Sequence, residues 1–151
     1  QILDAGNELE FKDVDYLEEI LERAPTLSEI YILLSKAYLA MDEDDNALET
    51  LLDGQKEIPN DPDIVVNLAE LLWDTEEDEL ALDYLEKALD EHPNSVPLLA
   101  SLGQYTFEVG DHDEARSYLS RAEALAPRHP ALVAARVKVT QLIQEEDDED
   151  E

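Results

Sequence analysis

Four prolines stand at a constant spacing in this sequence. Pro25, Pro59, Pro93 and Pro127 follow one another at intervals of 34 residues. A fixed period of this length is typical of an array of similar supersecondary units, each of which buries its apolar face against its neighbours. The period therefore predicts a repeat protein.

Each period contains two amphipathic helical patterns separated by a short turn. The best copy is residues 62–95, where the turn is acidic. We expect the first helix over roughly the first 14 residues of each block and the second over roughly residues 18 to 31. Ser28 is expected to cap the first helix of its block. The predicted organisation is a partial N-terminal repeat at 1–27, mainly its second helix at 11–24, then repeats at 28–61, 62–95 and 96–129, a capping helix at 130–144 and an acidic tail at 145–151.

Small and large residues recur at matching places in the blocks. In the second helices, an alanine is followed four residues later by a leucine: Ala47 and Leu51, Ala81 and Leu85, Ala115 and Leu119. In the first helices, a leucine is followed by a small residue: Leu34 and Ser35, Leu68 and Ala69, Leu102 and Gly103. Small residues beside large ones allow two helices to approach closely and interlock.

This alternation, closed by the aligned prolines, resembles the tetratricopeptide repeat (TPR) family over about residues 8–144. The resemblance implies an all-α fold, a right-handed superhelical solenoid of antiparallel helix-turn-helix repeats. The family favours Gly between the two helices, and Gly110 fits, whereas Asp42 and Glu76 stand there in the other blocks. We expect the fold to survive these departures, and the turn geometry at Asp42 and Glu76 stays open.

The charge of the chain restricts its partners. Forty acidic residues against ten basic ones give a net charge of -30. Nucleic acids and anionic membrane surfaces need clustered Lys and Arg, so the sequence predicts no nucleic-acid partner, and no apolar run is long enough for direct membrane insertion. A charged partner should be basic. The alternative is that the acidity is an adaptation to high salt, where screening removes self-repulsion.

No motif for chemistry is present. Cysteine is absent, which excludes disulfides, thiol catalysis and thiolate zinc sites. Residues 42–53 partly match a calcium-binding loop, but Ala47 occupies the position where such a loop needs Gly. The histidines, which we expect at the surface, are His92, His112 and His129, and no two have helical metal-site spacing. The sequence predicts no enzyme, no metal site and no cofactor.

The TPR resemblance implies a binding groove. In that family the first helices line the concave side of the superhelix and hold a peptide or helix of a partner protein. Trp73 and Phe107 occupy equivalent sites in successive repeats and would form an aromatic shelf there; the alternative is that both are packing residues. The groove residues implied by the resemblance are Ile32, Lys36, Leu39, Val66, Asn67, Glu70, Trp73, Ala100, Ser101, Gln104, Phe107 and Lys138.

The predicted function is that of a protein-interaction module, a scaffold or adaptor. One alternative is an accessory repeat domain of a larger enzyme or of an envelope or secretion assembly factor. Another is a self-assembling scaffold. The half-repeat at the N-terminus leaves Leu17, Ile20 and Leu21 poorly covered on one side, so either further repeats precede Gln1 or this end packs on a partner.

Basic residues are concentrated near the C-terminus. Between residues 116 and 138 the only acid is Glu123. This basic end patch consists of Arg116, Arg121, Arg128, Arg136 and Lys138. One hypothesis is head-to-tail self-association, in which the acidic N-terminal half or tail of a neighbouring molecule docks on the patch. The alternative is that the tail folds back and neutralises its own last helices.

Overall fold

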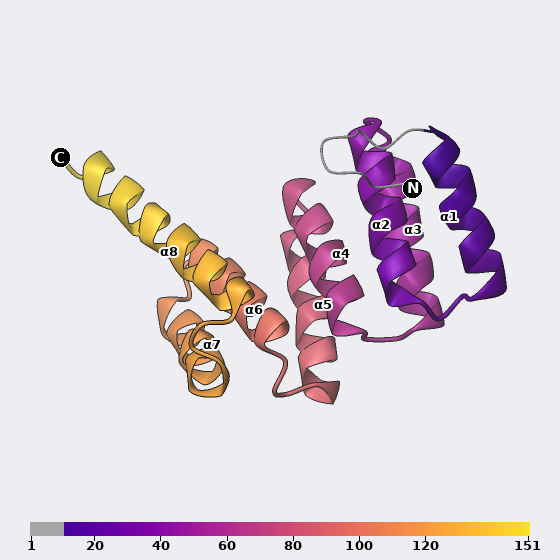
Figure 1. Cartoon of the computed structure of the whole chain (residues 1–151). Coiled ribbons are helices and arrows are strands. Elements are labelled where there is room, and N and C mark those ends of the chain that lie inside the picture. The colour runs from indigo at the N-terminus through magenta and orange to yellow at the C-terminus, as the bar shows by residue number, and fades with distance from the viewer. Residues whose placement is uncertain (1–10) are drawn as a thin grey trace. The chain divides into compact units, whose positions relative to one another are not determined.

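The computed structural model describes residues 11–151, which form eight helices in two compact units (Figure 1). The first unit, Gln1–Glu77, contains α1 (Phe11–Arg23), α2 (Ser28–Ala40), α3 (Asp44–Glu57) and α4 (Pro62–Asp74). The second unit, Asp78–Glu151, contains α5 (Asp78–Glu91), α6 (Val96–Glu108), α7 (His112–Leu125) and α8 (Pro130–Glu149). The all-α fold class is confirmed, with helices packed in sequential pairs. The division between the units falls between the two helices of the predicted repeat 62–95.

In the first unit, α2 packs between α1 and α3, and α4 packs on α2 and α3. Val14 and Leu17 of α1 form a buried cluster with Leu34 and Ala37 of α2. Leu17 is only 2% exposed, so the expectation that it lacks cover was wrong. The reason is that α2 packs along this face of α1 and supplies the apolar surface that Leu17 needs.

In the second unit, α6 is the central helix. Both α7 and α8 pack along α6, whereas α7 and α8 touch each other only sparsely. A Cβ atom on Gly103 of α6 would lie 2.6 Å from Leu119 Cδ2 of α7, which shows how closely these two helices approach. The helix α8 continues through Glu149, past residue 144 where the capping helix was expected to end. The first tail acids therefore extend α8 as solvated turns.

The turns between the two helices of each block share one backbone conformation. Asp42 and Glu76 have φ values of 58° and 64°, and Gly110 has 97°. All three lie in the left-handed region, which explains why Gly suits this position. The turn is thus kept where Gly is absent.

Helix starts follow the local sequence in most cases. The carboxylates of Asp61 and Asp111 accept hydrogen bonds from the N–H groups of Ile64 and Glu114, at 3.1 and 3.3 Å. Ser28 does not cap α2: the helix begins at Ser28 itself, with Leu27 in the capping position and no side-chain bond. His129, expected at the surface, is half-buried because its Nδ1 caps α8 by accepting from the Ala131 N–H at 3.1 Å.

Among the helices described, none is both long enough and apolar enough to cross a membrane.

Candidate functional site: an acidic groove in the first unit

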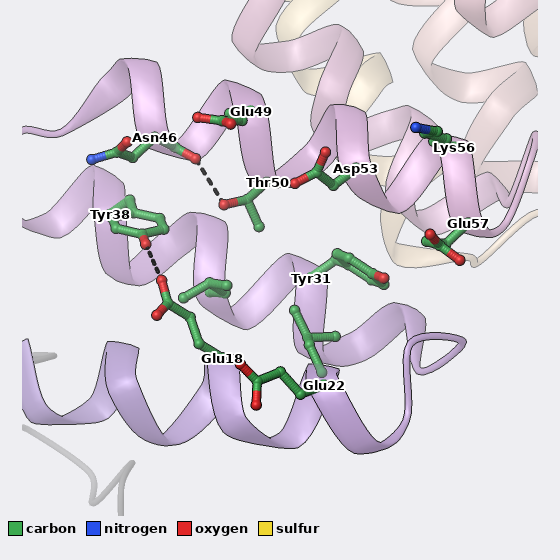
Figure 2. A pocket seen from close by; sticks show the side chains of 12 residues that line it. Glu18, Glu22, Tyr31, Tyr38, Asn46, Glu49, Thr50, Asp53, Lys56 and Glu57 are labelled. Atoms are coloured by element: carbon green, nitrogen blue, oxygen red, sulfur yellow. Dashed lines mark hydrogen bonds between the residues drawn. The ribbon is translucent and has the colours of Figure 1, made fainter.

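The helices α1, α2 and α3 enclose an open groove of about 610 Å³ (Figure 2). α1 and α3 form its two walls, and α2 forms its floor. The wall residues are Glu18, Leu21 and Glu22 from α1, and Asn46, Glu49, Thr50, Asp53, Lys56 and Glu57 from α3. The floor residues are Tyr31, Leu34 and Tyr38.

Helical spacing places the acids of each wall on one face. Glu18 and Glu22 are four residues apart on α1, and Glu49, Asp53 and Glu57 follow the same spacing on α3. Residues four apart lie above one another on a helix surface. Each wall therefore presents a row of carboxylates, and Figure 2 shows the two rows on opposite sides of the tyrosines.

Hydrogen bonds hold the aromatic floor in place. The Tyr38 hydroxyl donates to Glu18 Oε1 at 2.6 Å, which ties α2 to the α1 wall. The Tyr31 hydroxyl donates to the backbone carbonyl of Pro25 at 2.7 Å. Both rings are thus fixed between the acidic walls, and the Tyr38 bond occupies one carboxylate oxygen of Glu18.

The tyrosines also report the electrostatics of the groove. Burial raises the pKa of Tyr31 above its ordinary value, and the nearby charges of Glu57 and Asp53 raise it further. Burial likewise raises the pKa of Tyr38, followed by its hydrogen bond to Glu18 and the charges of surrounding acids. Both shifts have the sign that a negative potential produces, because that potential opposes formation of a phenolate.

The groove is suited to binding a cation-bearing chain. Five carboxylates face a single lining cation, Lys56. Lys or Arg side chains entering it would meet carboxylates on both sides and the half-buried Tyr38 ring below. The carboxylates attract cations by charge, and the ring attracts them through its face. In the part of the chain that the structure describes, no three His, Asp or Glu residues converge as a metal site. The Thr50 hydroxyl of the α3 wall donates to the Asn46 carbonyl at 2.7 Å rather than to a carboxylate.

The predicted first-helix groove divides between the units. Lys36 and Leu39 of α2 and Glu70 of α4 are exposed, and Trp73 of α4 is half-buried. The other predicted groove residues of the first unit are half-buried: Ile32, Val66 and Asn67. Those of the second unit are half-buried as well, namely Ser101, Gln104 and Phe107, except that Lys138 is exposed. Ala100 is 2% exposed. Because Trp73 and Phe107 belong to different units, the aromatic shelf stays a prediction.

Phe107 instead has a partner within its own unit. Its ring stacks on His112, with centroids 4.1 Å apart and the planes 9° from parallel. The two rings line a second cleft, of about 570 Å³, between α7 and α8. Arg116 and Arg136 of the basic end patch line this cleft as well.

The rest of the patch is spread over the second unit. Arg136 forms an ion pair with Glu123, and Arg121 donates to the Pro93 carbonyl at 3.3 Å. Arg128 and Lys138 are exposed.

Sequence reasoning missed the acidic groove because it sought ligand contacts only on the first helices. The groove walls α1 and α3 are both second helices. Leu34, which was interpreted as a packing residue, is indeed buried, at 4% exposure. The available signal was the four-residue spacing of acids on two neighbouring second helices, Glu18 and Glu22 followed by Glu49, Asp53 and Glu57.

Solved structures with the same fold are TPR proteins. TTC0263, a thermophilic TPR protein of Thermus thermophilus, superposes with a TM-score of 0.69 at 19% identity, covering 89% of this chain and 73% of that one. YrrB, described as a TPR protein with an unusual peptide-binding site, gives 0.60 at 18% identity, with 88% and 69% covered. A structure of MamA gives 0.61 at 16% identity, covering 90% of each chain. At these identities the similarity establishes the fold alone.

Sequence comparison identifies the family. The search of the curated proteins found no match to this sequence. The family model of the ChAPs, the Chs5p-Arf1p-binding proteins, matches residues 10–123, from the beginning of α1 to near the end of α7. The helix pairs, the left-handed turns and the closing prolines in this stretch are those of TPR repeats. The chain therefore belongs to the ChAPs family and is built of tetratricopeptide repeats.

Proposed function

We propose that this chain is a protein-interaction module that binds a basic segment of a partner protein in the acidic groove of the first unit. The observation that carries the proposal is the groove itself, with five carboxylates above a hydrogen-bonded aromatic floor. TPR proteins are generally protein-binding scaffolds, and the ChAPs family takes its name from two protein partners. A non-catalytic role agrees with both.

The chemistry of the groove favours an amphipathic ligand with Lys or Arg on one side. Its cations would pair with Glu22, Asp53 and Glu57, and its apolar side chains would contact the half-buried Leu21 and Tyr38. The net charge of -30 would speed the encounter with a basic partner, whereas the local carboxylates would fix its position.

The test uses a fluorescein-labelled amphipathic peptide of Leu and Lys, with binding measured by fluorescence anisotropy. The groove variant Glu22→Lys/Asp53→Lys changes two exposed wall residues. The control variant Glu79→Lys/Asp83→Lys makes the same charge change at exposed residues of α5, outside the groove. We expect the groove variant to weaken binding at least about tenfold, because it removes two attractions and adds two repulsions, and the control to change it about twofold or less.

Equal weakening by both variants would show that the peptide responds only to net charge, and the groove proposal would be rejected. A peptide with Glu in place of Lys should not bind the wild-type chain. Circular dichroism of each variant verifies that its helices are intact.

The first-helix surface implied by the repeats is a second candidate, with Trp73 on it in the first unit and Phe107 in the second. We propose that Trp73→Ala and Phe107→Ala weaken capture of the natural partner, because both side chains are half-buried aromatics with surface left to offer. If the groove variant no longer captures the partner but neither of these substitutions weakens its capture, binding is confined to the acidic groove.

A further inference from the structure

α8 carries an exposed face with the spacing of a coiled-coil seam. Val133, Arg136, Thr140, Ile143 and Asp147 alternate at intervals of three and four residues, and all five are exposed. Val133 is 49% exposed and Ile143 43%. The buried residues of α8, Leu132 and Ala135, lie on the face next to this seam, and α8 packs on α6.

The charge of α8 changes sign along its length. Its first part, residues 130–144, contains Arg136 and Lys138 and no acid. The next five residues, 145–149, are all acidic and still helical. At 20 residues, α8 is longer than α6 with 13, and its last turns project from the second unit (Figure 1).

We propose that α8 pairs in antiparallel orientation with α8 of a second copy of this chain, across a two-fold axis. Antiparallel pairing places the acidic end of each helix on the basic part of the other, and the symmetry provides this contact twice. Parallel pairing would place acid beside acid. The proposal rests on the second unit alone and does not depend on the acidic groove.

The seam also fixes the register. The seam has one basic member, Arg136, and one acidic member, Asp147. If Arg136 of each copy pairs with Asp147 of the other, the two-fold axis passes midway between them, between residues 141 and 142. Ile143 then lies beside Thr140 of the second copy, near the axis. The two pairs of Arg136 with Asp147 lie on either side of the axis. The cleft between α7 and α8 adjoins this seam, since Arg136, Thr140 and Ile143 line it together with Phe107 and Leu119. The second helix would cover part of this apolar surface.

A tail that folds back on its own helix does not fit this structure. Because α8 stays helical through Glu149, Asp147 lies about 16 Å along the axis from Arg136 of the same chain. Asp147 can therefore pair with Arg136 only in another copy, whereas Glu146 lines the cleft together with Arg116 and Arg136 of its own chain.

The absence of cysteine makes a crosslinking test clean, because a single introduced thiol can link only two copies. Ile143→Cys places the thiol near the axis. Val133→Cys, on the same seam and similarly exposed, is the matched control, because its two copies would be about 25 Å apart. With a short bismaleimide crosslinker, we expect the Ile143→Cys chain to form covalent dimers rapidly and the control only slowly. Equal rates for the two variants would overturn the proposal.

Charge reversal tests the register independently, with dimerisation measured by sedimentation equilibrium. Asp147→Arg should raise the dimer dissociation constant about tenfold, because two ion pairs become repulsions. The swap Arg136→Asp/Asp147→Arg should restore it, and Asp83→Arg on α5, with the same charge change, should leave it unaltered. A wild-type chain that is monomeric at all concentrations, or a swap that fails to restore dimers, would refute antiparallel pairing.

Discussion

Among residues 11–151, three residues other than glycine hold a left-handed backbone conformation, Asp42, Asn60 and Glu76, and two of them stand in the turns between paired helices. Asp42 and Glu76 adopt left-handed φ values of 58° and 64° in the turns between paired helices. For a residue with a Cβ atom this conformation costs about 1–2 kcal/mol, whereas glycine adopts it freely, as Gly110 does at 97°. The two helices on either side of each turn enforce the geometry.

Glu76→Gly should therefore stabilise the protein. We expect a gain of about 0.5–1 kcal/mol, since relief of the strain exceeds the extra entropy of glycine in the unfolded chain. Urea unfolding followed by circular dichroism measures the change. Asp83→Gly is the control: Asp83 is exposed within α5, where glycine lowers stability. A lower urea midpoint for Glu76→Gly would contradict the strain argument.

The sequence predicted where these turns lie but not their conformation. The period aligns Asp42 and Glu76 with Gly110. The backbone preferences of Asp and Glu alone do not indicate a left-handed turn. That conformation arises because the flanking helices pack against each other.

At the scale of elements, the acidic surface places like charges on neighbouring helices. Burial raises the pKa of Glu86 on α5, and the next largest causes are the charges of Glu114 on α7 and of Asp83 and Asp90. A raised pKa means that folding favours the protonated carboxyl over the carboxylate. At neutral pH, where Glu86 is ionised, its charge therefore opposes folding.

Glu86→Gln should raise stability at pH 7 by about 0.2–0.5 kcal/mol, a small figure because the site is largely solvent-exposed. The advantage should disappear as the pH falls through the raised pKa, since wild-type Glu86 then becomes neutral too. Thermal unfolding of both proteins from pH 7 down to pH 4 measures this convergence. Glu91→Gln, an exposed position at the end of α5, should alter the midpoint less. A destabilised Glu86→Gln at pH 7 would disprove the repulsion.

Helices and grooves differ in how far the sequence predicts them. The helices of the three full blocks begin and end within about a residue of the expected bounds, because the proline period and the apolar stripes fix them locally. The acidic groove requires α1 and α3 to face each other across α2, which spacing along a single helix does not reveal. Tyr38 illustrates the difference: its position is set by the repeat, while its bond to Glu18 depends on how α1 docks.

For the whole molecule, the dominant electrostatic fact is the net charge of -30. Arg23 forms an ion pair with Glu19 and Arg136 with Glu123, and both pairs are largely exposed. Exposed pairs of this kind contribute little to stability, so they offset little of the self-repulsion. Salt adaptation and selection of a basic partner both explain such a surface, and they differ in what salt should do.

If self-repulsion limits stability, the thermal midpoint should rise by several degrees between low salt and about 1 M NaCl, as the Debye length falls from about 30 Å at 0.01 M to about 3 Å. Binding of the Leu–Lys peptide should weaken over the same range, because screening acts on attraction as well as repulsion. Scanning calorimetry and anisotropy on the same samples measure the two effects. KCl serves as the control, since screening depends on ionic strength and not on which monovalent cation supplies it. A midpoint that stays flat in both salts would show that the acidic surface destabilises the fold little, and partner selection would then be the better account of its charge.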